Sequence, residues 1–101
     1  MHAALGGWRN ERQLRDEKNR RNIRRRGVDF ADAVRIFAGP TLEQVDGRED
    51  YGEIRIYCIG AADGVVITVI YTDRGDDERR IISAWKAEPQ EVRVYYRALY
   101  G

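Results

Sequence analysis

The sequence predicts an α+β fold: an antiparallel sheet of three to four strands, with two N-terminal helices and one C-terminal helix. Apolar residues recur at helical spacing over residues 30–37 and again over 92–99. Between these segments, runs rich in β-branched residues alternate with turn signals, which is typical of a meander of strands. The chain of 101 residues suits a single domain, residues 1–101, built around one modest core.

The N-terminal region is expected to open with a loose leader over residues 1–13, which contain a Gly-Gly pair and show no clear period. A short strand is expected near Trp8–Leu14. Asp16 is the expected N-cap of a first helix that runs to Arg26, and Gly27 is its expected left-handed end. Few apolar residues fall in this helix, so it should lie largely exposed beside the sheet.

A second helix is predicted directly after the first, with Asp29 as its N-cap. Its apolar residues follow the spacing i, i+3, i+4 and i+7, which places them on one face that should join the core. They are Phe30, Ala33, Val34 and Phe37. Gly39-Pro40 ends the helix, because neither residue continues it.

Strands are expected next, at Thr41–Val45, Ile54–Gly60, Val65–Thr72 and Arg79–Lys86. Ala-Ala-Asp-Gly at residues 61–64 predicts a hairpin, and the almost wholly apolar run of residues 65–71 predicts a central strand. Pro89 suits the first turn of a last helix that ends near Leu99. The apolar stripe of that helix consists of Val92, Tyr95, Tyr96 and Leu99.

Charge is distributed unevenly along the chain. Residues 1–27 carry a net charge of +6, and the remainder carries −5, although the whole chain carries only +1. Such a basic segment attracts nucleic acid or an acidic protein partner, or forms a solvated helix face.

Several kinds of site and location are disfavoured by composition. The single histidine, His2, and the single cysteine, Cys58, supply neither a zinc site nor a Cys/His pair, and we expect Cys58 to be a buried, inert thiol. No metal or other cofactor is therefore expected. The acidic cluster Asp46, Glu49, Asp50 and Glu53 either binds a cation or forms a solvated loop. The absence of a membrane-length apolar run or a signal-peptide core favours a cytoplasmic protein.

Basic residues on or beside the predicted strands are the candidate site. They are Arg55, Arg74, Arg79, Arg80 and Lys86. Simple alternation places Arg80, Ile82, Ala84 and Lys86 on one side of their strand and Arg79, Ile81, Ser83 and Trp85 on the other. Converging guanidinium groups suit phosphate binding, and nearby aromatic rings can stack on unpaired bases.

This residue set fits metal-independent RNA cleavage, in which the ribose 2′-hydroxyl attacks the adjacent phosphate and cations stabilise the transition state. Proton transfer then falls to Lys86, a tyrosine, Glu53 or Glu91, and the sequence does not choose among them.

Residues 16–95 resemble the BrnT toxins of bacterial type II toxin–antitoxin systems. The matching pieces are Lys18 with Asn22, Arg25-Arg26-Gly27-Val28 with Phe30, Ala33 with Phe37, Glu53 with Arg55, Tyr71-Thr72-Asp73-Arg74-Gly75, Arg80-Ile81-Ile82-Ser83-Ala84-Trp85-Lys86-Ala87, and Glu91 with Tyr95. The resemblance implies a RelE-like fold and a ribonuclease that arrests growth. It also implies catalytic roles for Arg55, Arg74, Arg80 and Lys86, with Lys18 and Arg25 as supporting phosphate contacts. From their own chemistry, Arg26 and Trp85 are further candidates for RNA binding, through a phosphate and through base stacking.

The same resemblance implies partners: RNA, and a BrnA-type antitoxin that binds the toxin in a hetero-oligomer. The exposed aromatics of the last helix, Tyr95, Tyr96 and Tyr100, are candidates for the antitoxin interface, although packing on the sheet is an equal expectation for the first two.

The chain departs from the family pattern at three places. The family commonly has a histidine where Arg26 stands and a basic residue where Trp85 stands, and its opening aromatic strand is poorly preserved in Arg12–Asp16. Arginine does not act as a base near neutral pH. The alternative function is therefore a catalytically inactive binding module that uses the basic segment to hold a protein or a nucleic acid.

Overall fold

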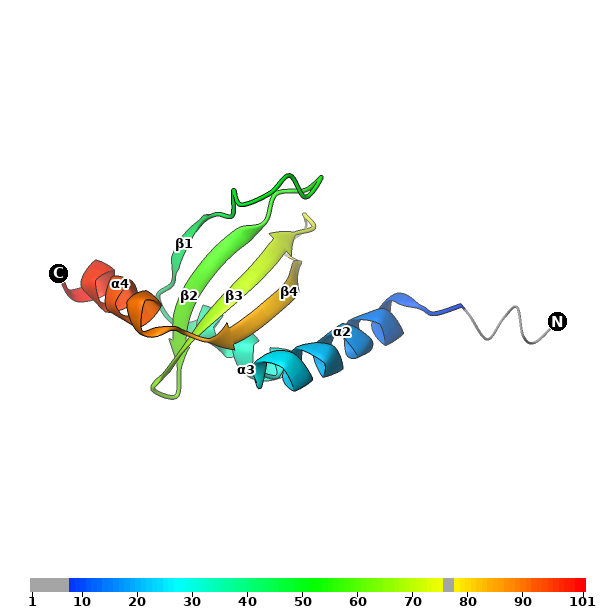
Figure 1. Ribbon diagram of the computed structural model, residues 1–101, viewed down its shortest axis with the longest axis horizontal. Helices are drawn as coiled ribbons and strands as arrows, with labels where there is room; N and C mark the ends of the chain where they lie inside the picture. Colours follow the sequence, from blue (N-terminus) through cyan, green and yellow to red (C-terminus); the bar gives the residue numbers. More distant parts are fainter. Residues whose placement is uncertain (1–7, 76–77) are drawn as a thin grey trace.

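The computed structural model describes residues 8–75 and 78–101. Its elements are α2 (Glu11–Arg26), α3 (Phe30–Ala33), the 3₁₀ helix η1 (Val34–Ala38), β1 (Leu42–Val45), β2 (Ile56–Ala62), β3 (Val65–Asp73), β4 (Arg79–Lys86) and α4 (Pro89–Tyr100). The four strands form one antiparallel sheet in the order β1-β2-β3-β4. The predicted α+β layout is confirmed. In Figure 1, α3 lies behind the sheet, α4 lies at one end, and α2 runs beside β4 and projects beyond it.

Helix α2 begins earlier than predicted. The Asn10 side chain accepts a hydrogen bond from the Gln13 amide, and the Gln13 side chain bonds the Asn10 amide in return. This capping box starts the helix at Glu11, so the expected strand at Trp8–Leu14 is wrong, and Asp16 lies inside the helix rather than at its cap. Gly27 ends it at φ 75°, as predicted. Residues 1–7 of the expected leader, with His2, lie outside the described residues.

Asn22 attaches α2 to the free edge of the sheet. Its amide nitrogen donates to the carbonyl oxygens of Val28 and Ala84, and its oxygen accepts from the Ala84 amide at 3.2 Å. Because it bonds both backbone groups of Ala84, the side chain pairs with the edge strand β4 as a peptide would. Asn22 is the buried residue of α2, which is otherwise largely exposed, as expected.

The second helix tightens after one turn. Asp29 caps α3, as predicted, by accepting from the Ala31 amide, but residues 34–38 form the 3₁₀ helix η1. With three residues per turn, Ile36 follows Ala33 into the core, and both are fully buried. Val34, which the four-residue spacing placed in the core, is 49% exposed.

The β2–β3 hairpin closes through a two-residue turn rather than the four residues expected. Asp63 and Gly64 have φ values of 51° and 78°, which suits the primed turns that join antiparallel strands. Ala61 and Ala62 therefore belong to β2. That strand begins at Ile56, two residues later than predicted, and β3 is buried along most of its length, as predicted.

The sheet has two different faces. The covered face, which packs on α3 and η1, contributes the main core cluster: Cys58, Ile67, Val69, Tyr71 and Ala84 from the strands, with Ala33 and Ile36 from the helices. Gly60 passes so close to η1 that a Cβ atom there would lie 2.8 Å from Cβ of Ile36. The second cluster lies on the opposite face, where α4 covers Ile59 and Val66.

A β-bulge changes the expected alternation of β4. Ile70 pairs with Ser83, but the next residue, Tyr71, pairs with Ile81, so Ile82 is an extra residue in β4. Arg79 and Ile81 consequently share the covered face with Ala84 and Lys86, whereas Arg80 lies opposite with Ser83 and Trp85. The simple alternation predicted for this strand is wrong.

Helix α4 is anchored at its start and at its middle. A capping box joins Glu88 and Glu91 at its start, and the buried Tyr95 donates to the Pro40 carbonyl at 2.9 Å. Tyr95 packs on the sheet, which was one of the two alternatives for it, whereas Tyr96 is 40% exposed and Tyr100 is 78% exposed. Within the described ranges, none of the helices is long and apolar enough to span a membrane.

Candidate nucleic-acid interface

The open face is the side of the sheet opposite α3, beyond the part that α4 covers. It carries Gln44, Tyr57, Ile70, Thr72, Arg80, Ser83 and Trp85, together with the loop of residues 46–55 between β1 and β2. It presents basic, aromatic and carboxylate side chains together. It is therefore the surface on which the predicted chemistry is best assembled.

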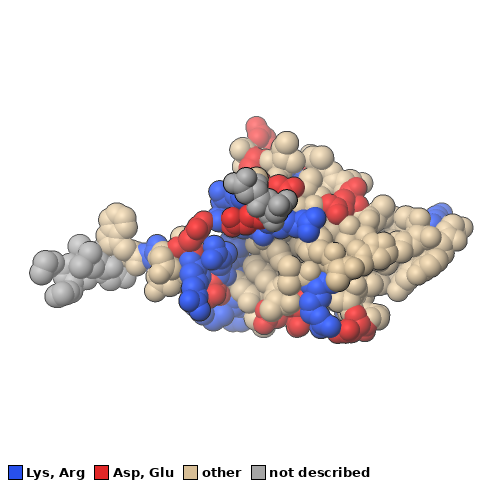
Figure 2. Space-filling model, turned by 180° about the vertical axis from the view of Figure 1, so that it is seen from behind, with Lys and Arg blue, Asp and Glu red and all other residues tan. Residues whose placement is uncertain are grey.

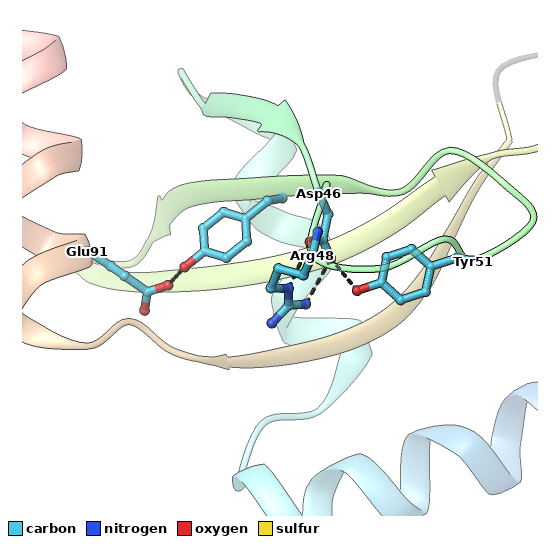
Figure 3. A network of polar contacts seen from close by, with 5 residues as sticks. Asp46, Arg48, Tyr51 and Glu91 are labelled. Carbon is cyan, nitrogen blue, oxygen red and sulfur yellow. Dashed lines mark hydrogen bonds and ion pairs between the residues drawn. The ribbon is translucent and has the colours of Figure 1, made fainter.

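The loop of residues 46–55 is fixed to this face by a buried carboxylate. Asp46, whose side chain is 1% exposed, accepts from Nε and Nη2 of Arg48 at 2.7 and 2.8 Å. It also accepts from the Tyr51 hydroxyl at 3.3 Å (Figure 3). Hydrogen bonds from Arg48 lower the pKa of Asp46 despite its burial, and those to Asp46 raise the pKa of Arg48.

Arg55 lies at the base of this loop. Its guanidinium carbon lies 4.1 Å from the centroid of the Tyr51 ring, and its Nε lies 3.2 Å from a carboxylate oxygen of Glu53. Thr72, on the neighbouring strand, donates to the carbonyl beside Arg55, that of Ile54, at 2.8 Å. Arg55 is therefore held at the end of the sheet where β3 leads into the β3–β4 turn.

Arg74 and Arg80 lie at the same end. Arg80 pairs across the ladder with Thr72, and the Arg74 amide bonds the Glu78 carbonyl at 2.9 Å in the following turn. The Arg80 guanidinium donates to Glu11 of α2, and this hydrogen bond lowers the pKa of Glu11. Three of the four predicted catalytic residues thus come together. Asp76 and Asp77, which the turn also contains, lie outside the described residues.

Lys86 does not join these arginines. It lies at the opposite end of β4 and on the covered face, six residues from Arg80, which is about 20 Å along a strand. There it lines a shallow pocket with Arg26, Arg35, Asp32 and Asp63. Its predicted catalytic role stays a prediction, and the geometry separates it from the arginine group.

Arg26 and Trp85, which were both predicted to bind RNA, are in contact. The guanidinium carbon of Arg26 lies 4.9 Å from the centroid of the Trp85 ring, across the edge of β4. The positions at which the chain departs most clearly from the BrnT pattern therefore form one pair, in which the helix supplies the cation and the strand supplies the aromatic ring.

Glu91 ties this aromatic group to α4. It accepts from the Trp85 indole at 3.1 Å, from the Glu88 amide at 2.7 Å, and from the Tyr57 hydroxyl. Its side chain caps the helix and fixes two rings of the open face, whose centroids lie 6.2 Å apart in an edge-to-face arrangement. These hydrogen bonds give Glu91 a structural role, and they occupy its carboxylate, which was a candidate base.

Helix α2 supplies a second basic surface beside the site. Near its N-terminus, Arg9 pairs with Glu17, and Glu11 pairs with both Arg15 and Arg80. Among the described residues, its later cations form no ion pair; they are Lys18, Arg20, Arg21, Arg24, Arg25 and Arg26. Lys18 and Arg80 line one groove of about 580 Å³ between α2 and β4. Figure 2 shows basic side chains of α2 beside this hollow, across from others near the β3–β4 turn.

The cysteine and the acidic cluster can also be placed in the structure. Cys58 is fully buried, and burial raises the pKa of its thiol to about 12, in keeping with an inert thiol. In the acidic cluster, Asp46 binds Arg48, Glu53 binds Arg55, and Asp50 accepts from the Gly52 amide. Among the residues described, no group of three His, Cys, Asp or Glu side chains is arranged to hold a metal ion.

Sequence reasoning missed Arg48 and Tyr51, because a loop rich in Asp, Glu and Gly has the pattern of solvated surface. The available signal was the local spacing: an Asp two residues before an Arg, and a Tyr five residues after the Asp.

Comparison with known proteins identifies the family of the chain. No curated protein sequence matches the chain. The family model for the ribonuclease toxin BrnT of type II toxin–antitoxin systems matches residues 15–91, which is well over half of the chain and includes most of α2, the whole sheet and the start of α4. The chain therefore belongs to the BrnT family of ribonuclease toxins of type II toxin–antitoxin systems.

Proposed function

We propose that the chain is a metal-independent endoribonuclease that binds single-stranded RNA on its open face. The observation that carries the proposal is the meeting of Arg55, Arg74 and Arg80 at one end of that face, in line with Tyr57 and Trp85 farther along it. Guanidinium groups bind phosphate oxygens in pairs, and aromatic rings stack on bases whatever their identity.

In the proposed reaction, the ribose 2′-oxygen forms a bond to the adjacent phosphorus while the bond from phosphorus to the 5′-oxygen breaks. The three arginines stabilise the added negative charge. Glu53, which lies beside Arg55, takes the proton of the 2′-hydroxyl, and water protonates the leaving oxygen. The products are a 2′,3′-cyclic phosphate and a 5′-hydroxyl.

Arg80 is the arginine that must change partners on binding. Its side chain is 18% exposed, and its guanidinium faces the carboxylates of Glu11 and Glu78. A phosphate that approaches from the open face replaces these contacts with a pair of charge-assisted hydrogen bonds between the guanidinium and two phosphate oxygens. The unpaired cations of α2 attract the same strand from the side.

Lys86 and Arg26 form a second basic group around the far end of β4, whereas Arg35, which lines the same pocket, is paired with Asp63. We propose that Arg26 and Trp85 contact RNA there, with Lys18 and Arg25 as supporting phosphate contacts. Lys86 then belongs to this outer group, where its removal weakens RNA binding more than it slows the chemical step.

We also propose that a BrnA-type antitoxin neutralises the protein in a hetero-oligomer. The exposed rings of Tyr96 and Tyr100, stacked with centroids 6.0 Å apart, are the candidate anchors on α4. Tyr95 is excluded as an anchor, because its ring is buried against the sheet.

The test is cleavage of a defined single-stranded RNA by purified protein in EDTA, with Arg80→Ala, Lys86→Ala and the control Arg35→Ala. We expect cyclic-phosphate ends from the wild type and from Arg35→Ala, a strong loss in Arg80→Ala, and a smaller loss in Lys86→Ala.

Absence of cleavage, on naked RNA and on translating ribosomes alike, would contradict the enzyme proposal. It would favour a catalytically inactive binding module, the alternative that fits an arginine, Arg26, at a position where the family commonly has a histidine.

A further inference from the structure

The structure assigns a further anion-binding role to Arg48, a residue of the β1–β2 loop. We infer that its guanidinium, held in place by the buried carboxylate of Asp46, binds a phosphate of the RNA at the centre of the open face. This inference rests on the proposed function and adds one residue to its binding surface.

Asp46 orients Arg48 but occupies only some of its N–H donors. The Asp46 carboxylate occupies the Nε proton and one Nη2 proton. Of the five N–H donors of a guanidinium, three remain directed away from Asp46. The Arg48 side chain is nevertheless 61% exposed, while that of Asp46 is 1% exposed. A buried carboxylate therefore holds an accessible cation, with donors to spare.

The position of Arg48 fits a strand of RNA that crosses the face. In Figure 3 it lies in front of the sheet, between Glu91 at the α4 end and Tyr51 at the other end. The Tyr51 hydroxyl donates to the same carboxylate, and the Arg55 guanidinium lies over the Tyr51 ring. Arg48 thus stands between the aromatic group around Glu91 and the arginine group around Arg55.

Orientation in advance is what distinguishes this arginine from an ordinary surface cation. A side chain already fixed loses less conformational entropy when it binds, so its contact contributes more to affinity. Arg35 offers a matched comparison, because it is also paired to an aspartate, Asp63, and is 53% exposed. Its partner is 69% exposed, however, and the pair lies on the covered side of the molecule.

The simpler role for Arg48 is to neutralise Asp46, and the experiment must separate the two. In the double variant Asp46→Asn/Arg48→Gln, the buried charge and its counter-charge are removed together. If Arg48 serves only to neutralise Asp46, the double variant should bind RNA like the wild type. If Arg48 contacts RNA, the double variant should bind RNA more weakly than the wild type.

The measurement is binding of a 2′-O-methyl oligoribonucleotide, which resists cleavage, as a function of salt concentration. We compare the wild type with Arg48→Ala, Arg48→Lys, the double variant, Arg55→Ala and Arg35→Ala, and record thermal unfolding of each. We expect about a tenfold loss of affinity in Arg48→Ala and in the double variant. The slope of log K against log salt should fall by about 0.7, the value for one phosphate of a single strand.

Arg48→Lys should bind almost as weakly as Arg48→Ala, because a lysine keeps the charge but not the forked contact with Asp46. Wild-type affinity and slope in the double variant, or a loss in Arg48→Ala no larger than that in Arg35→Ala, would overturn the inference. If Arg55→Ala is weakened at the same time, the proposed function survives without Arg48. If no open-face variant differs from the wild type, or the wild type itself does not bind, the proposed function fails with it.

Discussion

The two faces of the sheet are made from the same strands, yet their side chains have different surroundings. On the covered face, alternate residues of β2, β3 and β4 pack against Ala33 and Ile36, and Glu43 of the edge strand β1 accepts a hydrogen bond from the Tyr71 hydroxyl. On the open face, the intervening residues contact arginines, rings and carboxylates. Neighbours on one strand therefore have unlike roles.

Arg79 and Arg80 illustrate the difference most closely. Arg79 lies on the covered side, with its guanidinium carbon 4.3 Å from the centroid of the Phe37 ring and 5.4 Å from that of Tyr71. Arg80, the next residue, faces the other way and pairs with Glu11. The first shields the rim of the core, and the second is available to a ligand that displaces a surface carboxylate. A single residue of register thus decides which arginine belongs to the candidate site.

The largest effect on this comparison should come from Ile36→Ala. Ile36 is fully buried between η1 and β2, so its truncation leaves a cavity and should lower the free energy of unfolding by about 2–5 kcal/mol. Urea unfolding measures the change. Val34→Ala, two residues away on the exposed side, is the control and should stay within about 0.5 kcal/mol of the wild type. Similar losses in both would contradict the assignment of the core.

The next largest effect should come from Arg55→Ala, and it should appear in activity rather than in stability. Loss of one preorganised donor should slow RNA cleavage by about 100-fold. Its ion pair with Glu53 lies at the surface, so unfolding should shift by less than about 1 kcal/mol. A cleavage assay beside thermal unfolding gives both values. A large loss of thermal stability, with no specific loss of RNA cleavage rate, would make Arg55 a structural residue.

Asn22→Ala should affect the link between the two regions. Without the amide, the backbone groups of Ala84 and the Val28 carbonyl lose partners in a buried setting, which costs about 1–3 kcal/mol. Hydrogen exchange should show the Ala84 amide less protected and α2 loosened from β4. Arg20→Ala, on the exposed side of α2, serves as the control. An unchanged Ala84 amide would show that the edge of β4 does not depend on Asn22.

The smallest effect should be a change in acid sensitivity caused by Asp46→Asn. The pKa of Asp46 lies below its ordinary value of 3.8, mainly through the hydrogen bonds from Arg48. The ionised carboxylate therefore stabilises the fold above about pH 4, and this contribution is lost as the pH falls through the lowered pKa. The wild type should be more stable than the variant at pH 7, and the difference should shrink towards pH 2. A constant difference across that range would contradict the lowered pKa.

The sequence predicted the covered face better than the open one, and the reason is physical. Burial against helices imposes a periodic pattern, so the strands, the Gly27 stop and the Asp29 cap follow from residue order alone. The errors within this region arise where local geometry changes period: the 3₁₀ turn that exchanges Val34 for Ile36, and the bulge at Ile82.

The open face depends on contacts between residues distant in the chain, which no period encodes. The resemblance to BrnT toxins identified Arg55, Arg74 and Arg80, and the structure brings them together. It could not reveal that Lys86 lies apart, that Arg26 and Trp85 touch, or that Arg48 is held by Asp46. Each of these facts follows from strand register or loop closure.

The most direct test of the whole account is to map the RNA-binding face by NMR, using the 2′-O-methyl oligoribonucleotide and isotope-labelled protein. We expect shifts at the Trp85 indole, Thr72 and the side chains of Arg48 and Arg55, with little change at Cys58 or Ala33. Shifts concentrated on α3 and η1, or on α4 alone, would contradict the assignment of the open face as the nucleic-acid interface.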